Sequence, residues 1–216
     1  MSAGKATKAE GQSLAKSKST FREYAEAIGM ALLLALFIRT FIVQAFKIPS
    51  GSMIPTLQIG DHILVNKLAY GIRVPFVEDY VVDFSKPKRG DVVVFIFPED
   101  RSKDFIKRVI GVAGDEVQIR GKKVLINGKE IDDPRAHFEG DDPQTAGLSN
   151  RDDYGPRTVP ENHIFVMGDN RDRSYDSRFW GYVNLDEVRG KAFLIYWSWD
   201  GADRWVRWER LGSLIR

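Results

Sequence analysis

A single long apolar run near the N-terminus constrains this chain more than any other feature of its sequence. Residues 27–38 contain no charged or strongly polar side chain. As a helix they would rise roughly 18 Å, less than the roughly 30 Å hydrocarbon thickness of a bilayer. A spanning helix must therefore continue to about Val43 and include Arg39, whose long side chain can reach the headgroups from a helix end. We predict a transmembrane anchor over residues 23–45.

Two other interpretations of this run stay open. A helix buried in a soluble core would also be apolar, although here Leu and Ala lie on every helical face. The sequence Val43-Gln44-Ala45 resembles the cleavage site of a removable signal peptide, but 45 residues is long for such a peptide and Arg39 interrupts the apolar run. A retained anchor is the interpretation that we favour.

The segment before the anchor, residues 1–22, is polar and basic, which predicts a flexible tail. Against Glu10 it carries the basic residues Lys5, Lys8, Lys16, Lys18 and Arg22. Because basic flanks stay on the cytoplasmic side, we expect a cytoplasmic N-terminus and an extracytoplasmic domain over residues 46–216. The net charge of +2 gives no reason to expect a nucleic acid partner. The absence of cysteine from the sequence excludes disulfides, thiolate metal sites and a cysteine nucleophile.

The body of the chain reads as mainly β, because short runs of Val, Ile, Phe and Tyr alternate with Gly, Pro, Asp and Asn. The candidate strands are residues 62–66, 92–97, 105–112, 116–120, 124–126, 163–167 and 192–197. Asn127-Gly128 predicts a tight hairpin turn, since both residues accept positive φ. Residues 132–162 are too long and polar for an ordinary connection, so we expect a hairpin-like, cap-like insertion around residues 116–162. Outside the anchor, only residues 204–211 suggest a further short helix.

Three segments carry the residues that could do chemistry: 49–57, 105–111 and 168–178. Singly, each could be an ordinary turn, strand or charged loop. Together they supply the parts of an acyl-transfer site, which needs a nucleophile, a base and donors for the oxyanion. Ser52 follows Gly51, which lets the backbone turn sharply and present a hydroxyl and an N–H on one side.

Lys107 is the candidate base in this set. A lysine acts as a base only when neutral, so its pKa must fall from its ordinary value near 10.4. With alternation along a strand, Phe105, Lys107 and Val109 share one face, whereas Arg108 lies on the other face. Both faces are apolar apart from their central cation. This pattern predicts a strand covered on both sides, with Lys107 buried and Arg108 in need of a carboxylate partner.

These segments resemble the sequence boxes of the bacterial type I signal peptidase (leader peptidase) family. The resemblance covers about a third of the chain, in the family's order: the anchor through residue 57, then residues 89–95, 107–115 and 168–181. Its most specific motifs are Ser-Gly-Ser-Met-x-Pro-Thr and Gly-Asp-Asn-Arg-Asp-x-Ser-x-Asp-Ser-Arg. The family's fold is an all-β catalytic core with a β-ribbon cap. Some members have two N-terminal spans, whereas this sequence has one candidate, and the short insertion implies a small cap.

The resemblance implies a serine protease with a Ser/Lys dyad of Ser52 and Lys107. The Ser50 hydroxyl and the Ser52 N–H would be the oxyanion donors, and Ser174 would hydrogen-bond the Lys107 amine. Two ion pairs would support the dyad: Asp169 with Arg108, and Asp176 with Arg178. Shallow substrate pockets would be lined by Phe46, Ile48, Met53 and Phe105.

The resemblance also implies a substrate and a place of action. Family members cut the signal peptides of secretory precursor proteins after small residues, in an Ala-x-Ala pattern. The expected location is the bacterial cytoplasmic (inner) membrane, crossed once, close to the export channel. We expect the lipid bilayer as a partner, and neither a metal nor an organic cofactor.

Several rival hypotheses are weighed against this one. A Ser/Lys self-cleaving regulator predicts an N-terminal helix-turn-helix, the opposite of the tail and apolar run found here. A membrane-anchored β-domain that only binds export partners would keep its function without the dyad. A triad built on His163 is formally possible, and residues 172–183 resemble a calcium loop, although Ser177 and Val183 replace the glycine and glutamate that such a loop needs. For the C-terminal tryptophans we expect core positions for about half, and headgroup contact for others: Trp197, Trp199, Trp205 and Trp208.

Overall fold

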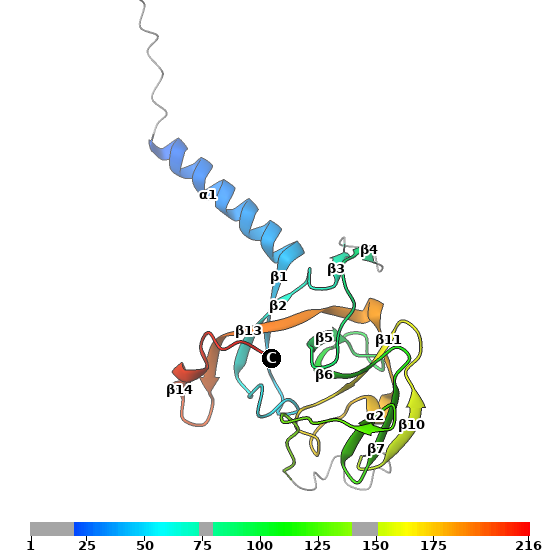
Figure 1. Ribbon diagram of the computed structural model, residues 1–216. Helices are drawn as coiled ribbons and strands as arrows, with labels where there is room; N and C mark the ends of the chain where they lie inside the picture. Colours follow the sequence, from blue (N-terminus) through cyan, green and yellow to red (C-terminus); the bar gives the residue numbers. More distant parts are fainter. Residues whose placement is uncertain (1–19, 74–79, 140–150) are drawn as a thin grey trace, which may run out of the picture. The chain divides into compact units, whose positions relative to one another are not determined.

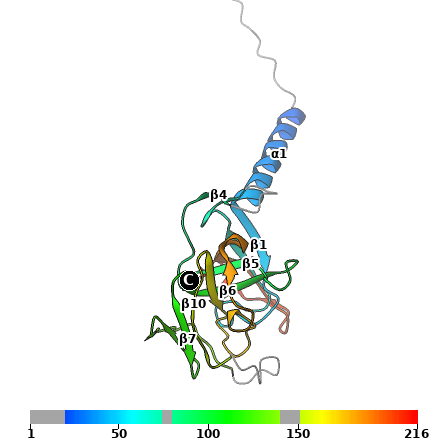
Figure 2. The same ribbon diagram turned by 90° about the vertical axis from the view of Figure 1, so that its right-hand side faces the viewer.

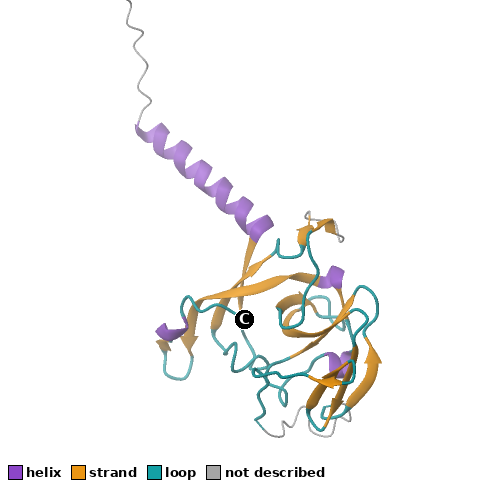
Figure 3. Ribbon diagram, viewed as in Figure 1, coloured by secondary structure: helices purple, strands orange, loops and turns teal. Residues whose placement is uncertain are grey.

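The computed structural model describes residues 20–73, 80–139 and 151–216, and its strands dominate the chain after the first helix (Figure 3). The chain divides into two units, residues 1–37 and residues 38–216. The flexible tail predicted for residues 1–22 lies outside the described residues up to residue 19. The mainly β architecture predicted for the body is confirmed by the strands and their pairing.

The apolar run forms α1 (Thr20–Phe37), which continues as a π-helical stretch, η1 (Ile38–Ile42). Together they span 23 residues with a mean hydropathy of 1.9, and none of the window is buried. By length and composition this is the one candidate membrane span among the described residues. The predicted anchor end at residue 45 needs correction, because Val43–Lys47 form β1 and pair with β2 (Asp61–Asn66).

One large antiparallel sheet organises residues 38–216 (Figure 1). Its strand order is β1-β2-β13-β5-β6-β11-β12, with β14 paired to β13. The remaining strands of this sheet are β5 (Val92–Ile96), β6 (Asp104–Val112), β11 (His163–Met167), β12 (Val183–Asn184), β13 (Val188–Asp200) and β14 (Trp205–Val206). Six of the seven strand predictions coincide with observed strands to within one residue at each end. The seventh, 192–197, lies inside β13, which is much longer. This strand pairs with β2 along one edge and with β5 along the other, and both pairings contain register shifts.

A second sheet of four strands, in the order β10-β7-β8-β9, occupies much of the predicted cap-like range 116–162. Its strands are β7 (Glu116–Arg120), β8 (Lys123–Ile126), β9 (Lys129–Glu130) and β10 (Tyr154–Thr158). Two views place β7 beside β10 (Figure 1 and Figure 2), as their pairing requires. The predicted hairpin turn is confirmed, with φ of 52° at Asn127 and 76° at Gly128 between β8 and β9. A third, two-stranded sheet pairs β3 (Gly71–Arg73) with β4 (Tyr80–Asp83).

Three short helical turns complete the described elements: α2 (Ser177–Trp180), η2 (Leu185–Glu187) and η3 (Trp208–Arg210). The helix expected over residues 204–211 is reduced to η3, because Trp205–Val206 pair with β13 instead. At the start of α2, the Asp176 side chain accepts a hydrogen bond from the Arg178 N–H, which is the role of an N-cap.

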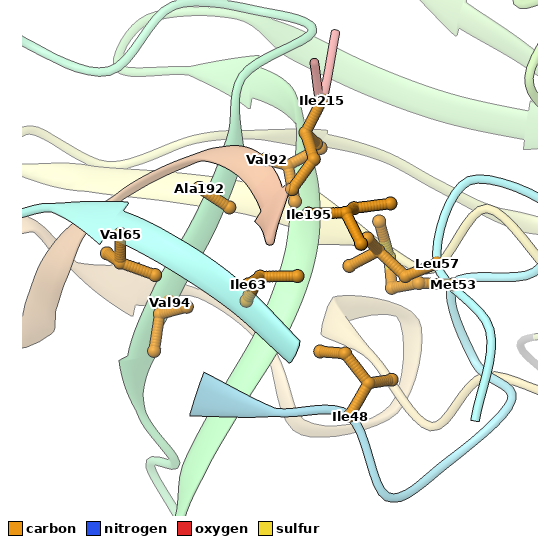
Figure 4. Close-up of a cluster of buried hydrophobic side chains, with 10 residues drawn as sticks. All are labelled: Ile48, Met53, Leu57, Ile63, Val65, Val92, Val94, Ala192, Ile195 and Ile215. Atoms are coloured by element: carbon orange, nitrogen blue, oxygen red, sulfur yellow. The ribbon is translucent and has the colours of Figure 1, made fainter. Parts of the chain in front are cut away.

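The central strand β5 is buried on both faces and lies between two of the three apolar clusters. All five residues of β5 are buried. Val92 and Val94 point into one cluster and Val93 and Phe95 into another, as alternation along a strand requires. The first cluster joins β2, β5 and β13 to the loop after β1 (Figure 4): Ile48, Met53, Leu57, Ile63, Val65, Val92, Val94, Ala192, Ile195 and Ile215. The loop that carries Ser52 is therefore packed onto the core.

The four C-terminal tryptophans are all exposed, by 36 to 65% of their surface. The expectation that about half of them are core residues was wrong. Along this part of β13 the buried position is Ser198, whose hydroxyl donates to Asp61 at 2.7 Å, so Trp197 and Trp199 face outward. Contact of these side chains with lipid headgroups stays a prediction.

Candidate active site

Ser52 lies in the loop between β1 and β2, residues 48–60, which we call the Ser52 loop. Its base is closed by a hydrogen bond from the Ile48 N–H to the Asp61 carbonyl at 2.8 Å. Met53, next to Ser52, has no exposed surface and holds the loop to the core. Ser52 itself is 8% exposed, so its hydroxyl is reachable but largely shielded from water.

Lys107 approaches Ser52 from β6, 55 positions later in the chain. Its Nζ lies 2.7 Å from Ser52 Oγ, and its side chain is buried. Phe105 and Val109, two residues to either side, pack into the apolar cluster that contains Val93 and Phe95, as the alternation along β6 predicted. The Phe105 ring centroid is 5.4 Å from Lys107 Nζ. The structure thus brings a hydroxyl and an amine together in a site with little solvent.

Burial lowers the pKa of Lys107 from 10.5 to about 8, because the ammonium loses its hydration in this site. Three nearby charges modify this effect: Asp176 raises the pKa, Arg178 lowers it and Asp169 raises it. Desolvation outweighs the two carboxylates. An amine with a pKa near 8 is neutral often enough near pH 7 to accept a proton from a hydroxyl at hydrogen-bonding distance.

Arg108, on the opposite face of β6, forms a buried ion pair with Asp169. Its Nε and Nη2 each donate to one carboxylate oxygen at 2.7 Å, which is the bidentate geometry that arginine favours. Thr56, in the Ser52 loop, donates its hydroxyl to the same carboxylate at 2.5 Å. Arg108 also donates to the Gly90 carbonyl at 2.7 Å. The pair therefore fastens the loop to β6 and to the segment after β11.

Asp176 and Arg178 form a second buried ion pair, with Nε–Oδ1 at 2.8 Å and Nη2–Oδ2 at 2.9 Å. Burial alone would raise the pKa of Asp176. The Arg178 charge, together with hydrogen bonds from Arg178, Ser174 and the Gly168 N–H, holds that pKa below its ordinary value. The carboxylate is thus negative at neutral pH and acts on Lys107 as a fixed charge.

Ser174 is fully buried, but it contacts different groups from those expected. Its hydroxyl accepts a hydrogen bond from the Gly168 N–H at 3.2 Å and hydrogen-bonds the Asp176 carboxylate. Among the described residues it makes no hydrogen bond to Lys107, so the structure does not form the contact predicted from the resemblance. The Asp176 carboxylate can only accept, so the Ser174 hydroxyl is the donor in that hydrogen bond.

Two residues that sequence reasoning gave no role, Gly168 and Asn170, lie against the Ser52 backbone. A Cβ on Gly168 would lie 2.3 Å from the Ser52 carbonyl oxygen and 2.3 Å from Ser174 Oγ, so only glycine fits here. The Asn170 N–H donates to the Ser52 carbonyl at 3.1 Å. Both belong to the Gly-Asp-Asn motif, but the motif alone does not say which atoms they touch.

The four predicted pocket residues have different environments. Met53 is fully buried and Ile48 is 2% exposed, so both pack into the first apolar cluster and present almost no surface to a substrate. Phe46 is partly buried against the same cluster, and Phe105 stacks on Phe97 with ring centroids 4.1 Å apart. Ser50, the predicted oxyanion donor, is exposed. Pocket formation by these side chains stays a prediction.

Comparison with known proteins decides the family. Residues 21–197 match the family described as signal peptidase, peptidase S26. The chain belongs to this family. It is 38% identical to the signal peptidase I of Pseudomonas fluorescens over 82% of this chain and 72% of the relative. It is also 38% identical to the signal peptidase I of Leptolyngbya laminosa, over 84% of this chain and 82% of the relative.

One solved structure also resembles about half of this chain. A solved signal peptidase I from Enterococcus faecalis V583 is 30% identical, with a TM-score of 0.40, over 50% of this chain and 98% of that chain. As a member of the S26 family the chain is a serine hydrolase of the signal peptidase I class. Family membership and the apolar span Thr20–Ile42 together indicate a membrane-anchored enzyme.

Proposed function

We propose that this chain removes N-terminal signal peptides from exported precursor proteins, with Ser52 as nucleophile and Lys107 as general base. The observation that carries the proposal is the 2.7 Å contact between Lys107 Nζ and Ser52 Oγ in a buried site. The names of the relatives, signal peptidase I, support the substrate class. Asp169, Arg108, Asp176, Arg178 and Ser174 support the site without touching the substrate.

The lowered pKa of Lys107 makes this chemistry feasible at neutral pH. With a pKa of 10.5, about 0.03% of the molecules would carry a neutral amine at pH 7, whereas with a pKa of about 8 roughly 9% do so. The gain in the reactive form is about 300-fold. Burial of Lys107 is therefore part of the catalytic mechanism that we propose.

In the first half of the reaction, neutral Lys107 takes the proton of the Ser52 hydroxyl as Oγ attacks the scissile carbonyl carbon. The carbonyl oxygen becomes negative and accepts hydrogen bonds from the Ser52 N–H and the Ser50 hydroxyl. The peptide bond then breaks, and the Lys107 ammonium returns its proton to the leaving amine. The signal peptide remains attached to Ser52 as an ester.

In the second half, water replaces the leaving amine. Lys107, neutral again, takes a proton from this water, which attacks the ester carbonyl carbon. The same two donors stabilise the second oxyanion. The ester bond breaks, Ser52 Oγ regains a proton from Lys107, and the signal peptide leaves with a new carboxyl terminus. No metal or organic cofactor takes part in either half.

The specificity that we propose is for small residues in an Ala-x-Ala pattern before the cleaved bond. Phe46 and Phe105, which keep some exposed surface, are the pocket residues that can contact a substrate as the structure stands. Shallow apolar pockets favour methyl side chains because larger ones would force side chains of the packed site to move.

We further propose the orientation of the enzyme in the bacterial cytoplasmic membrane. The basic segment 1–22 remains in the cytoplasm, the rest of the apolar span, residues 23–42, crosses the bilayer, and the catalytic domain lies outside, where precursors emerge from the export channel. This topology supports the proposed function, because signal peptides are themselves held at the membrane.

A cleavage assay tests the proposal. The full chain in detergent is mixed with a precursor that has an Ala-x-Ala site, and is compared with Ser52→Ala and Lys107→Ala, and with the exposed-site controls Ser102→Ala and Lys129→Ala. We expect cleavage by the wild type and both controls, and none by the two dyad variants. Equal cleavage by all five proteins would disprove the mechanism. Complete loss of wild-type activity with EDTA would indicate a metal instead.

A further inference from the structure

The side chain of Asn170 lies between the Ser52 loop and Glu139, and it is fully buried. Its Nδ2 is 3.4 Å from the Gly51 carbonyl oxygen and 3.1 Å from Glu139 Oε1. Both neighbours are acceptors, so the amide nitrogen, with its two N–H donors, must face them. The amide orientation is thus fixed by its contacts. The same residue also holds the Ser52 carbonyl through its backbone N–H at 3.1 Å.

The hydrogen bond from Asn170 to the Gly51 carbonyl oxygen also bears on the direction of the Ser52 N–H. The Gly51 carbonyl and the Ser52 N–H belong to the same planar, trans peptide unit and point in opposite directions. A donor that fixes the direction of the Gly51 oxygen therefore also fixes the direction of the Ser52 N–H. The Ile54 N–H contacts the same oxygen at 3.2 Å within the turn, whereas Asn170 contacts it from a different part of the chain.

Glu139 is itself held in place from several sides. Besides Asn170, its Oε1 lies 3.3 Å from His137 Nε2, and its Oε2 lies 3.0 Å from Arg173 Nε. The His137 backbone is bonded to the segment after β11: its N–H donates to the Asp169 carbonyl at 2.7 Å. The Glu139 carboxylate therefore has three side-chain partners, of which Asn170 is the buried one.

We propose that Asn170 and Glu139 are positioning residues that align the oxyanion donor of Ser52. Asn170 orients the peptide plane between Gly51 and Ser52, and Glu139 orients the Asn170 amide. Neither side chain touches the substrate. This inference rests on the proposed function, in which the Ser52 N–H stabilises the oxyanion, and it adds the part of the site that sets the direction of that N–H.

The variants Asn170→Ala and Glu139→Ala test the inference. Loss of a whole oxyanion donor costs roughly 10² to 10³ in kcat, so we expect a misaligned one to lower kcat roughly 10- to 100-fold, with KM changed less than about threefold. Glu139→Gln keeps an acceptor oxygen and should stay within about threefold of wild type. The matched control is Asn184→Ala, which deletes an amide that holds the Asp186 N–H, and it should cleave normally.

Two further readouts separate alignment from general damage to the site. A peptide aldehyde forms a hemiacetal with Ser52 whose oxygen occupies the oxyanion position, so its affinity should fall by the same factor as kcat/KM. The affinity of an uncleavable peptide, and the apparent pKa of the pH profile, should not change. Equal losses for both ligands, or a shifted pH profile, would overturn the inference in favour of a purely structural role.

The inference and the proposed function fail in different ways. An active Ser52→Ala variant would remove the proposed function, and the alignment of Ser52 would then have no meaning. An active wild type with normal kcat in Asn170→Ala and Glu139→Ala would remove the inference alone. Glu139 is an exposed residue, so its alanine variant keeps the test decisive even where Asn170→Ala does not fold.

Discussion

Replacing Lys107 with methionine should stabilise the folded protein at neutral pH while abolishing cleavage. The pKa of Lys107 is about 8 in the folded state and 10.5 without burial. Between these values the unfolded chain binds more protons, so the stability of the wild type rises with pH through this window. Below this pH window the amine is protonated in both states, and the cost of burying its charge is then present in full. From this difference in pKa, burial of Lys107 destabilises the folded wild type by about 3 kcal/mol at pH 7 and by about 2 kcal/mol at pH 9.

Methionine has nearly the same length and no charge, so Lys107→Met removes this destabilisation. It also removes the hydrogen bond to Ser52, which offsets the gain by about 1 kcal/mol. The net gain is then about 2 kcal/mol at pH 7 and about 1 kcal/mol at pH 9. For a chain of this size the first figure corresponds to a rise in Tm of about 4 to 8 °C. The assay is thermal unfolding of the full chain in detergent, followed by tryptophan fluorescence at both pH values.

The control is Lys129→Met, in the exposed strand β9, which should change stability by less than about 0.5 kcal/mol at either pH. The reasoning is refuted in two cases. One is a Lys107→Met variant that is less stable than the wild type at pH 7. The other is a stability difference that does not shrink between pH 7 and pH 9, because only the titration of a desolvated amine produces that dependence.

Three more outcomes follow from the site. Because activity requires neutral Lys107, kcat/KM should rise about tenfold per pH unit and level off near pH 8; a flat profile from pH 6 to pH 8 would contradict this. Gly168→Ala should lose at least about tenfold in cleavage rate, since its Cβ would collide with the Ser52 carbonyl, whereas Gly201→Ala, in open space, should cleave normally. Asp169→Ala should lower the free energy of unfolding by about 3 to 5 kcal/mol in thermal unfolding, because it leaves Arg108 buried without its partner; a change below 1 kcal/mol would argue against that burial.

Local sequence patterns predicted much of the fold, because they depend on neighbours along the chain. The alternation around Lys107 indicated a strand buried on both faces, and β6 has that environment. Asn127-Gly128 placed the hairpin turn, since positive φ is a property of those two residues. The length of β13 was not predictable in the same way. Different parts of β13 pair with β5, β2 and β14, and none of these partners is visible from residues 188–200 alone.

The site was less predictable than the strands because its contacts are chosen among competing partners. The sequence motifs contain Ser174, Asp176 and Lys107, but the nearest acceptor for the Ser174 hydroxyl is decided by distances in the folded chain. There the Ser174 hydroxyl donates to the Asp176 carboxylate and accepts from the Gly168 N–H. The roles of Gly168 and Asn170 depend on contacts with backbone atoms of the Ser52 loop, and side-chain chemistry gives no signal for such contacts.

The Ser52 loop is held in place by groups that come much later in the chain. Asn170 bonds the Ser52 carbonyl, Asp169 accepts the Thr56 hydroxyl, and Arg210 donates to the Thr56 carbonyl at 3.0 Å. During synthesis, Ser52 and Lys107 leave the ribosome long before these groups do. A growing chain thus has both reactive groups before it has the groups that hold the Ser52 loop. The loop can therefore reach the geometry described here only after Asp169, Asn170 and Arg210 have emerged and folded against it.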